Sequence, residues 1–195
     1  WSFFDLPLLG PKAGGTFLRL GPFFYVFQYV SGLVFGTDPV GYALGVMLLS
    51  TATIGVFFLL ARRFFSDQLS LGLTALLSVS AYFVMYGRFA WNPNPLPFFI
   101  LAGFYALLRS VDMRERRRGV WFGTCAALLG MASQLHFLAF ITLPVLVAGF
   151  FLIRRPKYSW RAWLSALGIV GLLYLPVALN EIETQGQNSR EFVMA

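Results

Sequence analysis

Several polar and charged side chains stand between long apolar runs, at positions where they could bind an anion. Arginine binds phosphate through a bidentate fork, and lysine or amide donors add to such a site. Polar groups are costly at membrane depth and usually face a cavity or a partner. The pattern therefore predicts a site for an anionic ligand such as a lipid phosphate. The candidate binding residues are Lys12, Arg19, Arg88, Asn92, Asn94, Gln134 and His136.

Each candidate also has a purely structural interpretation. Arg88 could extend its side chain to the lipid headgroups. Asn92 and Asn94 alternate with prolines in "WNPNP", where asparagine forms turns and helix caps. His136 could be a hydrogen-bonded residue at the membrane interface, and Lys12 a solvated loop charge. The sequence leaves these alternatives open.

Other chemistries lack their usual residues. The sequence contains no P-loop, no HExxH, no GxSxG and one cysteine, Cys125, so an internal disulfide is excluded. We expect no metal site and no certain cofactor, and a requirement for a divalent metal stays open. Asp5 precedes the glycine-rich stretch that holds Lys12, where a general base could stand.

The composition places the chain in a membrane. Of its 195 residues 58% are hydrophobic and 12% charged, and the mean hydropathy is +0.71. Soluble domains carry about 25% charged residues. The net charge of +7 does not indicate nucleic acid, because the basic residues come in short clusters between apolar runs. The fold class that we predict is an all-α, polytopic transmembrane helical bundle.

About six spans are predicted, together with a shorter aromatic segment, 22–35, that suits a helix lying in the membrane interface. The chain must reverse direction near His136, between the fourth and fifth spans. The predicted spans are 41–61, 69–86, 94–108, 120–134, 137–153 and 162–179.

Basic residues define an orientation for these spans. If the spans alternate in direction, eleven of the fifteen Lys and Arg residues fall on one side, in loops near residues 62–63, 109–118 and 154–161. The positive-inside rule makes that side cytoplasmic. Lys12, Arg19 and Arg88 are then on the outer side. We accordingly divide the chain into an outer loop with an interfacial helix (1–40), a transmembrane helical domain (41–180) and the start of a second outer loop (181–195).

The order of motifs resembles a known family. "PLLGPKAGGTFLRLGPFFYVF", "GRFAWNPNPLPFFILAGFYALLR", "ASQLHFLAFITLPVLV" and "YLPVALNEIETQGQNSREF" are similar to the dolichyl-phosphate-mannose–protein mannosyltransferase-like family. These are membrane glycosyltransferases of the GT-C fold, and their relatives include bacterial aminoarabinose transferases that modify lipid A. The chain looks like a fragment of such a protein, inactive by itself.

The resemblance implies site residues. In such enzymes an Asp of the first outer loop deprotonates the acceptor hydroxyl, and either Asp5 or a carboxylate upstream of Trp1 takes that position here. Asn92 stands where relatives often have Asp, so it would bind or orient the substrate. His136 would replace a cation near the donor phosphate. Arg19 matches a loop position that carries donor contacts.

The function implied is transfer of a sugar from a polyprenyl-phosphate donor to an acceptor at the outer face of a membrane, presumed to be the bacterial inner membrane. The expected partners are the lipid-linked donor, membrane lipids and a glycan, lipid or protein acceptor. The alternative is a non-enzymatic carrier or flippase for a lipid-linked or anionic substrate. Transporters often repeat their halves, and no repeat is visible here.

Overall fold

The computed structural model describes residues 5–12 and 19–193, and within them the chain is almost entirely helical. The described residues form no β-strand, and an isolated antiparallel bridge pairs Lys12 with Arg19. The helices are α1 (Phe23–Phe35), α2 (Pro39–Ala61), α3 (Asp67–Ser78), α4 (Ala81–Tyr86), α5 (Leu96–Val111), α6 (Arg118–Leu135), α7 (Phe137–Arg154), α8 (Trp160–Glu183) and α9 (Gln187–Val193).

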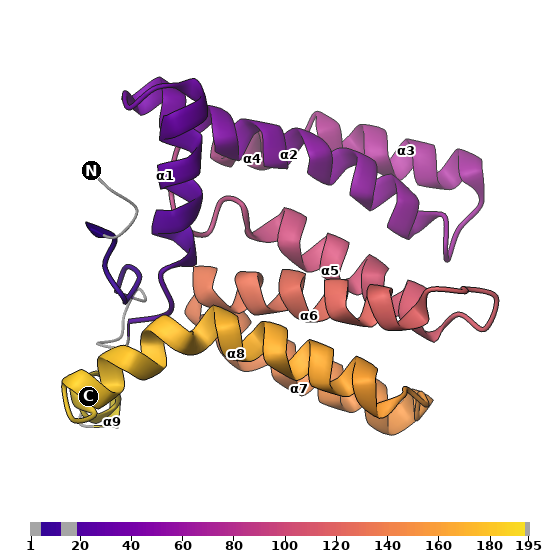
Figure 1. Cartoon of the computed structure of the whole chain (residues 1–195). Helices are drawn as coiled ribbons and strands as arrows, with labels where there is room; N and C mark the ends of the chain where they lie inside the picture. Colours follow the sequence, from indigo (N-terminus) through magenta and orange to yellow (C-terminus); the bar gives the residue numbers. More distant parts are fainter. Residues whose placement is uncertain (1–4, 13–18, 194–195) are drawn as a thin grey trace.

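Most helices lie lengthwise beside one another, and the connections gather at two ends (Figure 1). One end, which we name the basic end, holds the connections 62–66, 112–117 and 155–159. The other, which we name the terminal end, holds residues 5–12, helix α9, the α4–α5 connection and the α6–α7 turn. The three basic loops therefore share one end, as the predicted alternation of spans requires. The chain reverses at His136, between α6 and α7.

Helix α1 crosses the terminal end roughly at right angles to its neighbours (Figure 1). The hydroxyl of Ser31 joins it to α2, donating to the carbonyl of Gly41 at 2.8 Å and accepting from the amide of Gly45 at 3.2 Å. With 13 residues α1 is too short to span a bilayer. Its orientation is the one expected of an interfacial helix.

Three helices, α2, α7 and α8, are long and apolar enough to cross a membrane. The predicted second span, 69–86, is wrong as a single helix: it is divided into α3 and α4. Around the break, the Ser78 hydroxyl donates to the Ala75 carbonyl and Ser80 adopts an extended conformation. Serine hydroxyls compete in this way with the regular backbone bonds. The predicted third span, 94–108, corresponds to α5, which has 16 residues and is shorter than α2, α7 and α8.

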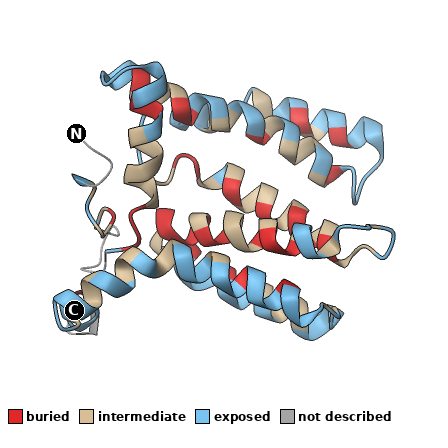
Figure 2. Ribbon diagram, in the orientation of Figure 1, coloured by how far each residue is buried: buried red, intermediate tan, exposed pale blue. Residues whose placement is uncertain are grey.

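Helix α6, the predicted fourth span, lies in the middle of the bundle. Many of the buried residues of the bundle belong to this helix (Figure 2). It packs against α5, α7 and α8. At Gly103 of α5 an added Cβ would overlap the side chain of Leu129 on α6, so the glycine permits a close helix contact. The outer helices instead expose apolar side chains, as expected of surfaces that face lipid.

Local signals explain where these helices begin. The Asp38 carboxylate accepts a 2.6 Å hydrogen bond from the amide of Gly41, and Pro39 occupies the first turn of α2. The hydroxyl of Ser159 caps α8 by accepting from the amide of Ala162. Each cap satisfies one of the amides that a helix start leaves unpaired.

Candidate functional site

Two of the predicted cationic residues, Lys12 and Arg19, are brought together at the terminal end. They face each other across the isolated antiparallel bridge, and the amide of Gly10 donates to the Leu20 carbonyl at 2.7 Å beside it. Both side chains are exposed. Their pairing places two positive charges at one point of the surface.

Asn188 of α9 holds this bridge in place. Its side-chain oxygen accepts from the Arg19 amide at 2.9 Å, and its side-chain nitrogen donates to the Arg19 carbonyl at 3.1 Å. Asn188 is buried, and 169 residues of sequence separate it from Arg19. Asn188 was not among the predicted site residues, because nothing in the local sequence indicates a contact between the C-terminal segment and the N-terminal loop.

Between the bridge and the end of α8 lies a cavity of about 300 Å³, which we name the cationic cavity. Lys12 and Arg19 supply two positive charges and Glu191 one negative charge, so the charged lining is net positive. The Glu191 carboxylate accepts from the side-chain amide of Gln187 at 2.9 Å. The lining residues are Leu9, Lys12, Arg19, Asn180, Thr184, Gln187, Asn188 and Glu191.

Gln134, predicted to bind substrate, has a structural role. Its side chain is 2% exposed, and both ends of the amide are satisfied: the oxygen accepts from the Phe23 amide at 3.1 Å and the nitrogen donates to the Leu173 carbonyl at 2.7 Å. It also packs so closely on Gly21 that an added Cβ there would overlap it. Gln134 thus ties the start of α1, and the loop that carries Arg19, to α6 and α8.

His136 and Asn92 meet at the α6–α7 turn. The Asn92 side chain donates to the Leu135 carbonyl at 2.8 Å, and His136 caps α7 by accepting from the Leu138 amide at Nδ1, at 3.2 Å. His136 therefore serves as the N-cap of α7, and its role near a donor phosphate stays a prediction.

Arg88 does not join these residues. It lines a separate cavity of about 320 Å³ beside Ser50, Thr51 and Ser78, between α2, α3 and α4, and the lining includes neither Asn92 nor His136. Asn94 is buried and donates to the Phe89 carbonyl at 2.9 Å, so it stabilises the proline-rich turn.

Asp5, the predicted general base, is exposed and is absent from the lining of the cationic cavity. Among residues 5–12 and 19–193, no three His, Cys, Asp or Glu side chains gather in a way that could hold a metal ion. The polar groups that the cavity does offer, cations and amides, suit an anion.

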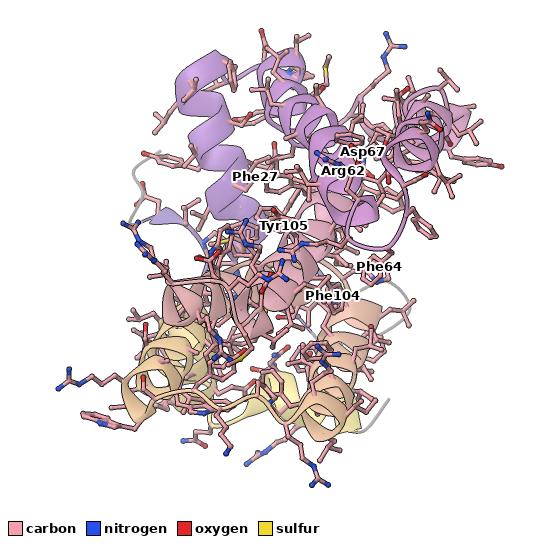
Figure 3. All side chains as sticks on the ribbon, turned by 90° about the vertical axis from the view of Figure 1, so that its right-hand side faces the viewer. Phe27, Arg62, Phe64, Asp67, Phe104 and Tyr105 are labelled. Atoms are coloured by element: carbon pink, nitrogen blue, oxygen red, sulfur yellow. The ribbon has the colours of Figure 1, made fainter. Side chains whose placement is uncertain are left out.

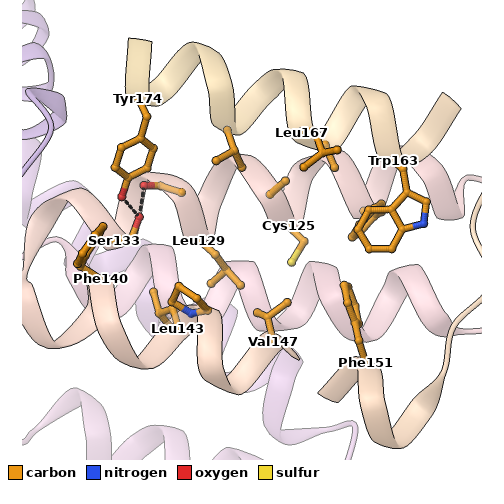
Figure 4. Close-up of a pocket in the computed structure, with 16 residues that line it drawn as sticks. Cys125, Leu129, Ser133, Phe140, Leu143, Val147, Phe151, Trp163, Leu167 and Tyr174 are labelled. Atoms are coloured by element: carbon orange, nitrogen blue, oxygen red, sulfur yellow. Dashed lines mark hydrogen bonds between the residues drawn. The ribbon is translucent and has the colours of Figure 1, made fainter. Parts of the chain in front are cut away.

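An apolar groove of about 380 Å³ lies between α6, α7 and α8 (Figure 4). Cys125, Leu143 and Trp163 are among its lining residues, with aromatic Phe151 near one end. At the opposite end the Ser133 and Tyr174 hydroxyls bond to each other at 2.7 Å. The groove is thus apolar along its length, with this hydroxyl pair at one end.

Helix α8 connects the groove to the cationic cavity. Tyr174 lines the groove and Asn180 lines the cavity, separated by about 9 Å of helix axis at 1.5 Å per residue. Between them Pro176 interrupts the helix hydrogen bonding, and Figure 1 shows that α8 changes direction along its length. An apolar surface and a cationic one therefore follow each other along one helix.

A family model described as dolichyl-phosphate-mannose-protein mannosyltransferase matches residues 20–179, most of the chain. The chain belongs to this mannosyltransferase family. The matched segment covers α1 to α7 and most of α8. Lys12, Arg19 and Asn188 lie outside it.

Among solved structures, the chain is similar to ArnT from Cupriavidus metallidurans in the apo state, with a TM-score of 0.65 and 18% identity. The similarity covers 95% of this chain and 41% of that one, so this chain spans less than half of the ArnT length. The likeness confirms the predicted all-α membrane bundle of the GT-C type. A search of curated protein sequences found no match.

Proposed function

We propose that this family member is part of a membrane glycosyltransferase that moves a sugar from a polyprenyl-phosphate donor to an acceptor at the outer face of the bacterial inner membrane. The observation that carries the proposal is the cationic cavity, where Lys12 and Arg19 meet at the terminal end. Membership of the mannosyltransferase family supports the reaction class.

The chemistry of the donor matches the cavity. When the sugar leaves, negative charge grows on the lipid phosphate, and cations aimed at that position stabilise the transition state. Among the residues that the structure describes, the Arg19 guanidinium has no ion-pair partner. It can therefore bind the phosphate without first breaking an ion pair. Asn188 holds the Arg19 backbone and acts as a positioning residue.

The isoprenoid tail of the donor would lie in the apolar groove between α6, α7 and α8. A polyprenyl phosphate has a charged head joined to a long apolar chain. The cationic cavity and the apolar groove follow each other along α8 in the same order. Burial of apolar surface contributes about 25 cal/mol per Å², so the groove would supply affinity and the cavity orientation.

The acceptor hydroxyl requires one carboxylate within hydrogen-bond reach. Asp5 precedes the bridge in sequence, but it does not line the cavity. We propose that the base comes either from Asp5 after rearrangement of the N-terminal segment or from a residue upstream of Trp1.

The test uses the full-length protein in detergent, with polyprenyl phosphate as the probe. We expect Arg19→Gln to weaken binding about ten- to a hundredfold, the loss that follows from removing one hydrogen bond to a charged group. Arg117→Gln is the matched control, because Arg117 is exposed near the basic end. Equal affinity for Arg19→Gln and wild type would contradict the proposed phosphate site.

A second measurement separates a transferase from a carrier. In liposomes with a radiolabelled polyprenyl-phosphate sugar and acceptor, a transferase releases free polyprenyl phosphate, which chromatography detects. Movement of intact donor across the bilayer without that product would instead establish a carrier.

A further inference from the structure

A cavity of about 750 Å³ opens at the basic end, far from the cationic cavity. Its walls come from the last turn of α2 and the residues after it, from the C-terminal half of α5 and the connection that follows, and from the end of α7. Figure 3 looks onto this end and labels Phe64 and Phe104, which line the cavity from two of these elements. None of the predicted site residues lines this cavity.

The inner walls are apolar. Phe104, Leu107 and Leu108 of α5 and Phe150 of α7 are among the lining residues. At the opening Phe64 is 65% exposed, an aromatic ring at the level where aromatic side chains gather at membrane–water interfaces. Such a surface suits a hydrocarbon chain better than a small soluble ion.

The rim of the cavity carries charge. Arg63 donates to the Asp112 carboxylate at 3.2 Å and stands over the Tyr105 ring, 5.6 Å from its centroid. Arg154, the last residue of α7, forms no ion pair with any residue that the structure describes. Two positive charges and one negative charge therefore border apolar walls, with Arg154 available to a ligand.

We propose that this cavity binds an anionic phospholipid of the leaflet at the basic end. Its phosphate lies against Arg154 with Arg63 beside it, and an acyl chain follows the walls formed by Phe104, Leu107 and Phe150. The positive-inside rule makes this the cytoplasmic leaflet, where anionic lipids are attracted by basic residues near the membrane surface.

The donor lipid is not the occupant. A polyprenyl phosphate is also an anionic lipid, but the proposed donor site is at the terminal end, on the opposite side of the membrane. An inorganic phosphate would leave the apolar walls uncovered. A glycerophospholipid covers both the walls and the arginines.

Native mass spectrometry of the full-length protein in detergent tests the assignment, with phosphatidylglycerol and phosphatidylcholine as probes. We expect phosphatidylglycerol to bind more tightly, and Arg154→Gln to weaken its binding about fivefold, which corresponds to ~1 kcal/mol for one basic residue at an anionic surface. Asp112→Asn should strengthen binding, because it removes the negative charge that competes with the lipid phosphate for Arg63. Asparagine retains the oxygen that accepts from the Arg114 amide.

Two further variants complete the test. Arg155→Gln is the matched control, because Arg155 adjoins Arg154 but is absent from the lining. Leu108→Trp should fill the apolar space and weaken both lipids without changing charge. Equal binding of the two lipids, equal losses for Arg154→Gln and Arg155→Gln, or no effect of Leu108→Trp would each overturn the site. If polyprenyl phosphate displaced the lipid bound in the cavity and phosphatidylglycerol did not, the assigned occupant would be wrong. If neither lipid bound, the proposed site would be overturned.

Discussion

Loss of the Gln134 side chain should lower both the stability of the protein and its affinity at the proposed donor site. It is buried, and its amide bridges the Phe23 amide and the Leu173 carbonyl. Gln134→Met is nearly isosteric and removes both hydrogen bonds. Gln134→Glu keeps an oxygen for the Phe23 amide and loses the donor to Leu173.

The expected magnitude follows from the groups left behind. A buried polar group without a partner costs about 1–3 kcal/mol, so Gln134→Met, which leaves two such groups, should lower the free energy of unfolding by about 2–6 kcal/mol and lower the unfolding midpoint. Gln134→Glu should lower the free energy of unfolding by at least the contribution of one of the two hydrogen bonds. The reason is that an ionised carboxylate would also be buried without a charged partner.

Thermal unfolding of the full-length protein in detergent, followed by circular dichroism, measures these changes. Gln68→Met is the control, because it makes the same substitution at an exposed position of α3. Because Gln134 also anchors the loop that carries Arg19, the affinity for polyprenyl phosphate should fall with the midpoint. If Gln134→Met and Gln68→Met unfolded at the same temperature, the buried amide would not hold α1, α6 and α8 together.

Two other predictions concern the rest of the bundle. The Arg114 backbone amide and then the Arg63 guanidinium hold the pKa of the Asp112 carboxyl below its ordinary value, so the ion pair with Arg63 is present at neutral pH and is lost only as pH falls below about 4. A nitroxide attached at position 113 should gain mobility in that acidic range. In the Asp112→Asn variant the nitroxide should already have this higher mobility at pH 7. Constant mobility at all pH values would contradict the prediction. Gly103→Ala should destabilise the α5–α6 contact by about 1–3 kcal/mol through overlap with Leu129, whereas Gly168→Ala, in open space, should be neutral or stabilising. Thermal unfolding of the two variants distinguishes them, and equal midpoints would mean that the α5–α6 contact adapts to the added methyl group.

Hydrophobic runs and basic clusters in the sequence were sufficient to predict the class of fold, most of the helices and the end at which each loop lies. These properties depend on transfer of local segments from water to lipid, and a window of about 20 residues contains that information. The start of α2 at Asp38 likewise depends on a contact between residues three apart, which a local window of sequence contains. The break between α3 and α4 was missed, because it contains no proline. The Ser78 hydroxyl donates to the Ala75 carbonyl there, and the Ser80 backbone is extended.

The candidate site divides in the same way. Residue type alone pointed to Lys12 and Arg19, and the tertiary structure places them across one bridge. Residue type also pointed to Gln134 and His136, but the structure uses their polar atoms for a buried clamp and a helix cap. A side chain's chemistry indicates what it is able to bind, whereas the neighbours that satisfy it come from distant parts of the chain. Asn188, which is separated from Arg19 by 169 residues, therefore became part of the site only through the fold.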